Sequence, residues 1–106
     1  MDREKKQIIL TEKSELLKVI AHPVRLCLLN CLMESSCNVT TLVHLMEIPQ
    51  STVSQHLAKL RTAGIIAGTR NGLEVTYRVI NTDVIKIIEL IVHEDIETLN
   101  IHNTIG

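Results

Sequence analysis

The spacing of apolar side chains along the first third of this 106-residue chain predicts two helices. Apolar residues recur with the helical period across about 7–21, although a polar cluster at 11–15 interrupts the pattern. A second helical pattern spans about 23–33 and begins with a proline, which suits the first turn of a helix because that turn needs no N–H donor. We therefore expect a helix, a break at His22-Pro23, and a second helix.

Two helices joined by a short turn are expected next. Ser35, Ser36 and Asn38 form a loop that also supplies the cap of a third helix over about 40–47, since such side chains can accept from the first backbone amides of a helix. Pro49 opens a fourth helix, about 49–63, and Gly64 suits the left-handed residue that follows many helices. This arrangement is a helix-turn-helix, and 49–63 takes the place of its recognition helix.

After the fourth helix the period changes from 3.6 to 2, which predicts strands. Two alternating segments, 65–70 and 73–79, flank Asn71-Gly72. This dipeptide is a strong hairpin signal, because both central positions of the type I′ turn require a positive φ. We expect a β-hairpin wing over about 65–80, with Asn71 and Gly72 at its turn.

A last helix, about 82–101 and capped by Asn81, completes the order helix, helix, helix-turn-helix, hairpin, helix. The expected fold is mainly α with a β-hairpin, a winged helix-turn-helix (α-α-α-α-β-β-α), with residues 1–106 as a single domain. This architecture binds duplex DNA more often than any other partner. A winged helix that docks on a protein is the alternative.

The stretch PQSTVSQHLAKL at 49–60 carries the main functional signal. On a helical wheel, Val53, Leu57 and Leu60 converge on one face, which must pack on the domain. The opposite face is polar and short, and it holds Ser51, Gln55, Ala58, Lys59 and Thr62. Because a solvated helix face normally carries long charged side chains, this face is suited to lie close to a surface. An ordinary solvated helix is the alternative.

The major groove of DNA is such a surface, since it admits one helix and presents base edges that glutamine, serine and threonine can bond. The candidate base contacts are Thr52, Ser54 and Gln55, and the candidate phosphate contacts are Ser51 and Lys59. His56 is a further candidate, but it lies nearer the buried side, where a structural hydrogen bond is favoured. The candidate contacts in the wing are Arg70, Asn71 and Arg78. A merely solvated hairpin is the alternative for the wing.

Charge and composition narrow the interpretation further. The net charge is −1, but residues 51–78 hold four basic side chains and one acidic side chain. Tyr77 is the only aromatic residue, which argues against proteins that stack single-stranded bases on aromatic rings. No apolar run approaches a membrane span, no secretory signal is recognisable, and no catalytic arrangement or phosphate loop is found. We expect a cytoplasmic protein that is no enzyme, with neither a cofactor nor a membrane partner.

Three segments in this order resemble the ArsR/SmtB family of bacterial winged-helix repressors: AHPVRLCLLNCL, IPQSTVSQHLAKLRTAGII and RNGLEVTYRV. The resemblance covers about 14–92, and within the family it is greatest to the PagR-type members. It implies a homodimer paired through the first and last helices, a palindromic double-stranded DNA operator, and repression relieved by a signal. Apolar stripes on both terminal helices independently favour the dimer, because a monomer would expose them. The sequence leaves the inducer open.

The metal sites of the family are not matched here, so we expect no intact one. One family site uses a C-x-C-D-L run in the third helix, where this chain has 38–42 (NVTTL) with Cys37 displaced by one residue. The other uses the last helix, where the corresponding positions hold Asn81, Asp83, Glu94 and Glu97, with His93 adjacent. No imidazole falls in register, and an all-oxygen set would be a poor zinc site.

The three cysteines permit a different sensor. Cys27 and Cys31 are four residues apart on the second helix, so their side chains lie within reach of each other, and Cys37 follows in the next loop. Three nearby thiolates could bind a soft species such as arsenite, or could be oxidised. Cys31 lies at the margin of the buried stripe and Cys27 further out, so structural or incidental cysteines are the alternative.

Overall fold

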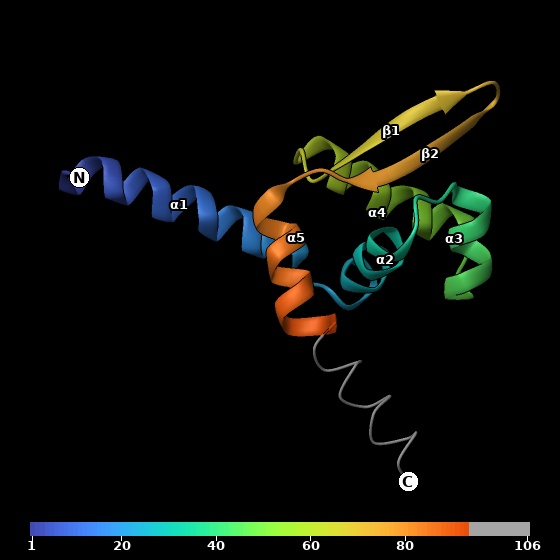
Figure 1. Ribbon diagram of the computed structural model, residues 1–106, viewed down its shortest axis with the longest axis horizontal. Helices are drawn as coiled ribbons and strands as arrows, with labels where there is room; N and C mark the ends of the chain where they lie inside the picture. The colour runs from blue at the N-terminus through green and yellow to red at the C-terminus, as the bar shows by residue number, and fades with distance from the viewer. Residues whose placement is uncertain (94–106) are drawn as a thin grey trace, which may run out of the picture.

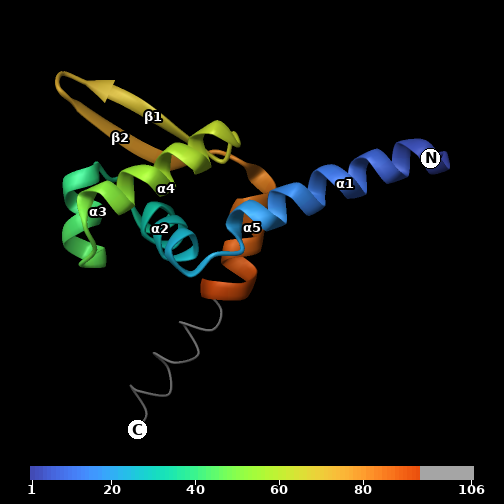
Figure 2. The same ribbon diagram turned by 180° about the vertical axis from the view of Figure 1, so that it is seen from behind.

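A computed structural model describes residues 1–93 and has the architecture of a winged helix-turn-helix (Figure 1). Its elements are α1 (Arg3–Ile20), α2 (Pro23–Glu34), α3 (Val39–Met46), α4 (Gln50–Thr62), β1 (Ile66–Asn71), β2 (Glu74–Val79), α5 (Thr82–Ile88) and η1 (Glu89–His93). In both views α4 runs between the hairpin and α2, while α1 projects from the side opposite α3 (Figures 1 and 2). The expected mainly α fold with one hairpin is confirmed.

The first helix is longer than the apolar pattern indicated. α1 begins at Arg3, where the Asp2 side chain accepts from the Lys5 amide at 2.9 Å, and it runs unbroken through 11–15. The polar cluster interrupts only the apolar pattern, because lysine and glutamate favour helices and can lie on an exposed side. α2 begins at Pro23 as expected, and the His22 ring caps it by accepting from the Val24 amide at 3.1 Å.

Local caps set the helix-turn-helix. The loop before α3 supplies its cap as expected, through Asn38, which accepts from the Thr41 amide at 2.8 Å, so α3 begins one residue before the predicted start. α3 also ends one residue early, because Glu47 adopts a left-handed conformation with φ 56°. α4 begins after Pro49 and is followed by Ala63 and by Gly64, whose φ of 73° fits its expected role after the helix.

The wing is a two-stranded antiparallel hairpin in which Ile66 pairs with Val79 and Asn71 with Glu74. This register corrects the predicted turn. Asn71 is the last residue of β1 and has no positive φ, whereas Gly72 has φ 68°. Gly72 and Leu73 therefore form the two-residue connection, as in a type II′ turn, whose glycine takes the first central position.

A short pairing that the sequence pattern did not predict joins the loop before α3 to the wing. Cys37 forms an isolated antiparallel bridge with Tyr77 of β2, with N–O distances of 2.8 and 3.3 Å. The base of the wing is thus held to the helix-turn-helix by backbone hydrogen bonds as well as by packing.

The last helix differs from the prediction over 82–101. Asn81 caps α5 as expected, accepting from the Val84 amide at 3.0 Å, but the α-helix ends at Ile88 and continues as one turn of π-helix, η1. Residues 94–101 of the predicted helix lie outside the described residues. In the described part, no single helix is long and apolar enough to cross a membrane, although α1 and α2, bent by 91°, pass that test of length and composition together.

One aliphatic core holds these elements in place. Its buried members come from the five α-helices, from the loop before α3 and from the start of the hairpin: Ile20, Leu28, Leu29, Leu32, Cys37, Leu42, Val53, Leu57, Leu60, Ile65, Ile66, Val84 and Ile88. α4 contributes three of them on one face, so the opposite face of α4 is fixed outward. The core thereby determines which side chains of α4 a partner can reach.

Candidate nucleic-acid interface

The outer face of α4 presents the side chains that the sequence indicated. Val53, Leu57 and Leu60 are buried on the inner face, with exposed fractions of 0, 2 and 0%. Most of the candidate DNA contacts on α4 are exposed, namely Ser51, Ser54, Gln55 and Lys59, whereas Thr52 is half-buried. The face is therefore polar, low in profile and positively charged at its C-terminal end, where Arg61 joins Lys59.

His56 makes the structural hydrogen bond that the sequence favoured for it. Its Nδ1 accepts from Arg25 Nε of α2 at 3.1 Å, and its ring lies against that of His22, with centroids 4.6 Å apart. Burial, reinforced by the nearby His22 and Arg25 charges, lowers the pKa of His56. A neutral ring keeps Nδ1 as an acceptor, so this hydrogen bond links α4 to the start of α2. A direct contact of His56 with DNA stays a prediction.

Arg25 is a residue whose place at this surface sequence reasoning missed. Besides bonding His56, it donates from Nη1 to the Val19 carbonyl in the last turn of α1 at 2.8 Å. It therefore joins α1, α2 and α4 at one point. The only signal in the sequence was an arginine two residues after Pro23. Periodicity alone cannot connect it to His56, which lies 31 residues later.

The wing candidates are all exposed, but their side chains differ in freedom. Arg78 donates from Nη1 to the Thr69 hydroxyl across the hairpin at 2.9 Å, so part of its donor capacity is used within the wing. Arg70 and Asn71 lie next to the turn, and their side chains make no hydrogen bond or ion pair within residues 1–93. Glu74, the only acidic residue of the wing, accepts from Asn38 Nδ2 at 2.9 Å, so its carboxylate is directed toward the start of α3.

The three cysteines occupy three different environments. Cys27 is exposed, Cys31 half-buried and Cys37 buried. Burial, reinforced by the adjacent Cys27 thiol, raises the pKa of Cys31 to about 11, and burial also raises the pKa of Cys37. Both are therefore thiols at neutral pH, which disfavours nucleophilic and soft-metal chemistry.

Cys37 lies in the segment paired with β2, donates to the Ser35 carbonyl at 3.1 Å, and contributes to the raised pKa of Cys31. Cys27 and Cys31 are a neighbouring pair, close enough for Cys27 to raise the pKa of Cys31. A redox or arsenite role of the three thiols stays a prediction.

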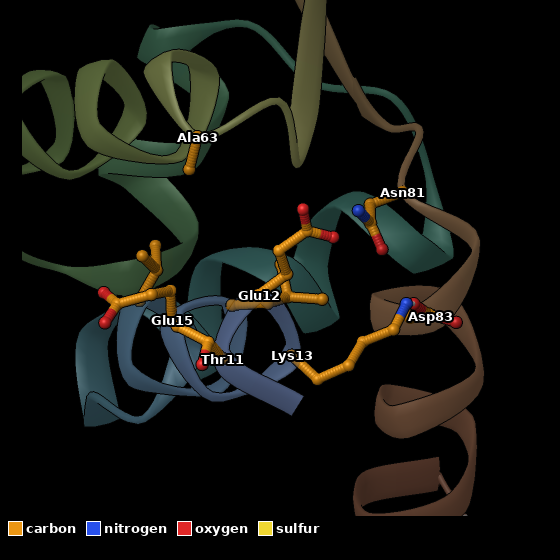
Figure 3. Close-up of a pocket in the computed structure, with 9 residues that line it drawn as sticks. Thr11, Glu12, Lys13, Glu15, Ala63, Asn81 and Asp83 are labelled. Atoms are coloured by element: carbon orange, nitrogen blue, oxygen red, sulfur yellow. The ribbon is translucent and has the colours of Figure 1, made fainter. Parts of the chain in front are cut away.

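The candidate metal positions at the start of α5 have structural roles. A groove of about 480 Å³ separates α1 from the start of α5, and across it Lys13 of α1 reaches Asp83 in an ion pair (Figure 3). This hydrogen-bonded pair lowers the pKa of Asp83 and raises that of Lys13. Asn81 is the helix cap, and Glu94 and Glu97 lie outside the described residues. Within residues 1–93, no three His, Cys, Asp or Glu side chains are arranged to hold a metal ion.

Comparisons with known proteins agree with this geometry. Residues 22–67 match the family described as bacterial regulatory protein, arsR family. The chain is 40% identical over 92 residues to the transcriptional repressor PagR of Bacillus anthracis. The aligned segment covers 86% of this chain and 92% of PagR. It is 46% identical over 70 residues to the repressor SmtB of Mycobacterium tuberculosis, covering 66% of this chain and 52% of SmtB.

Two solved structures have a similar fold. The crystal structure of PagR aligns with a TM-score of 0.73 at 42% identity, over 79% of this chain and 97% of PagR. The solution structure of the homodimeric winged helix-turn-helix domain of Mb0332 from Mycobacterium bovis aligns with a TM-score of 0.76 at 23% identity, over 92% of this chain and 91% of that one. The latter shows the fold alone.

Proposed function

Because this chain belongs to the ArsR family of bacterial DNA-binding transcriptional regulators, we propose that it is a dimeric repressor that binds a palindromic operator through α4 and the wing. The observation that carries the proposal is the outer face of α4. Its exposed Ser51, Ser54, Gln55 and Lys59 stand on a helix that three buried side chains hold in one rotation. Ser54, Gln55 and Thr52 read base edges, and Ser51 and Lys59 contact phosphates.

The wing completes the contact with DNA. Arg70 and Asn71 are free to reach the backbone or the minor groove beside the groove that α4 enters, and Arg78 supports them from β2. Because the chain as a whole is nearly neutral, affinity depends on this local set of basic residues, and the salt dependence corresponds to a few phosphates per protomer. Such a regulator acts in the cytoplasm, where its operator lies.

Exposed apolar side chains support the dimer. On α1, Ile8, Leu10 and Leu17 are 58, 55 and 49% exposed, and on η1 Leu90 and Ile91 are 63 and 48% exposed. Side chains of this kind on both terminal helices form an interface when two copies pair by two-fold symmetry. Two α4 helices then enter successive major grooves about 34 Å apart.

We propose that the signal that relieves repression is not a metal bound at the start of α5. There, Asp83 is paired with Lys13, and Asn81 is occupied by capping α5. A thiol-responsive repressor is the second candidate, because Cys27 lies near enough to Cys31 to raise its pKa and Cys27 is exposed. Oxidation of this pair with diamide, followed by operator titration, separates a thiol sensor from a repressor that ignores thiol oxidants.

Gln55→Ala tests the reading of DNA by α4. Gln55 is exposed, so the variant should unfold like the wild type but lose about 10- to 100-fold in affinity for its best half-site, with relaxed preference at one base pair. Anisotropy titration against a library of duplexes measures both effects. Gln7→Ala, an exposed glutamine of α1, is the matched control and should bind as the wild type does. Unchanged preference in Gln55→Ala would instead favour a winged helix that docks on a protein.

Leu17→Glu tests the dimer. A carboxylate at this half-exposed position of α1 should shift sedimentation toward the monomer and weaken operator binding, because a monomer loses the second half-site. Leu45→Glu changes a leucine of similar exposure on α3, far from α1, and should remain dimeric. Equal sedimentation of both variants and the wild type would contradict pairing through α1.

A further inference from the structure

A hollow of about 460 Å³ lies at the C-terminal half of α4, beside the face proposed to meet DNA. Its lining comes from three helices and the residue after α4: Val19, Arg25, Ala58, Lys59, Thr62 and Ala63. Two of these side chains are cationic and one carries a hydroxyl, while the rest are small or aliphatic. The hollow therefore combines two positive charges with small, uncharged side chains, on the side of α4 that carries Lys59.

Arg25 is held in a fixed orientation within this lining. Its Nε donates to His56 at 3.1 Å and its Nη1 to the Val19 carbonyl at 2.8 Å. A guanidinium has five N–H donors, so three remain after these two hydrogen bonds. Among residues 1–93, no carboxylate lies within ion-pairing distance of Arg25 or Lys59. Arg25 is thus half-buried and oriented, Lys59 is exposed, and neither cation is neutralised by the described part of the chain.

We propose that this hollow seats one backbone phosphate of the operator in each half-site, bound by Arg25, Lys59 and the Thr62 hydroxyl. This inference rests on the proposed DNA-binding function and adds Arg25 and Thr62 to its contacts. A planar guanidinium and a hydroxyl match the tetrahedral oxygens of a phosphodiester, and such contacts fix the register of a protein on DNA without reading sequence. Ala58 and Ala63 leave room for the adjoining sugar.

The same hydrogen bonds explain how this phosphate would be coupled to base reading. Arg25 holds His56, and the flanking residue Gln55 is the proposed base contact. A phosphate bound to Arg25 therefore sets the depth and rotation of α4 in the groove. His56 acts here as a positioning residue, whose acceptor Nδ1 holds the guanidinium in line with the hollow.

The test is a cycle between protein variants and single methylphosphonate substitutions along the operator, each of which removes one phosphate charge. In the wild type, neutralising the phosphate seated in the hollow should weaken binding about tenfold. In Arg25→Gln the same substitution should have a smaller effect, because only Lys59 and Thr62 still contact that phosphate, and the slope of log K against log salt should fall by about 0.9 per protomer.

Thr62→Val provides an independent test of the phosphate site in case Arg25→Gln does not fold. Thr62 is exposed at the end of α4, so the variant keeps the fold, and its sensitivity to that same methylphosphonate should be reduced. The control is Arg61→Gln, an exposed arginine of α4 that does not line the hollow, which should retain the wild-type sensitivity. If Arg25→Gln and Thr62→Val both retain full sensitivity at every phosphate, the proposed phosphate site is wrong.

A free anion is the other source of the same chemistry. Inorganic phosphate, titrated at constant ionic strength without DNA, should give no saturable rise in melting temperature. A saturable rise that Arg25→Gln abolishes would assign the hollow to a free anion and overturn the proposal. If the wild type prefers no duplex at all, both the proposed function and the phosphate site are wrong. If both variants retain full methylphosphonate sensitivity, only the phosphate site is wrong.

Discussion

Leu42→Ala should be among the most destabilising single changes in the helix-turn-helix. Leu42 is the buried residue of α3, with no exposed surface, and α3 has only eight residues to hold it on the domain. Leu45 lies three positions further along the same helix but is 58% exposed. The pair offers the same chemical change in the same helix at two extremes of burial.

The magnitude follows from the carbons removed. Leucine to alanine deletes three carbons, each contributing about 0.8 kcal/mol when fully buried, or roughly 2.4 kcal/mol in total. The cavity that remains raises the loss at Leu42 to about 3–4 kcal/mol per protomer. At Leu45 more than half of the side chain is already in water and no cavity forms, so the loss should be about 1 kcal/mol or less.

Urea unfolding followed by circular dichroism measures both values, at one protein concentration because dimer stability depends on concentration. We expect the Leu42→Ala midpoint to lie roughly 1 M or more below that of Leu45→Ala. Losses that agree within about 0.5 kcal/mol would refute the reasoning. They would mean that α3 shifts freely enough to fill the space, or that it is not packed as the structure places it.

Three further outcomes are expected. Because the pKa of His56 in the native protein is lowered from 6.5, the stability that His56 contributes is present above pH 6.5 and is lost as the pH falls through the native pKa. His56→Gln should therefore flatten the decline of the urea midpoint below pH 6.5. An unchanged decline would contradict this expectation. Asn38→Ala should lose about 1 kcal/mol through its cap on α3, whereas Asn38→Asp should keep most of that cap while losing the donor to Glu74; equal urea midpoints for the two variants would count against the capping role. In thiol labelling of the native protein, Cys27→Ser should remove the fastest phase, since Cys27 is the exposed thiol, and a surviving fast phase would assign that reactivity to another cysteine.

The candidate site could be predicted in its main part because α4 carries its own signal. Buried leucines and valine at helical spacing fix one face, so the residues between them must face outward. Exposure of Ser51, Ser54, Gln55 and Lys59 follows from this rotation alone. Arg25 could not be placed in the same way, since its approach to His56 depends on the angle at which α2 crosses α4, which no local period encodes.

The wing shows that local sequence patterns predict a hairpin but do not determine its strand register. Asn71-Gly72 predicted a hairpin correctly, but not which two residues form its turn. Register is decided by the pairing of whole strands, here with Ile66 opposite Val79 at the base and Cys37 bonded to Tyr77 on the other edge of β2. These contacts shift the turn by one residue and leave Leu73 fully exposed at its tip.

The sequence by itself determined the order of the elements and most of their ends, because periodicity, the caps Asn38 and Asn81, and Gly64 act within one or two turns of the chain. Only the tertiary structure decided the contacts that join distant segments. The ion pair between α1 and α5 spans 70 positions, and the hydrogen bond from Arg25 to His56 spans 31. Their formation depends on how the aliphatic core sets one helix against another, and that geometry is a property of the packed molecule rather than of any stretch of it.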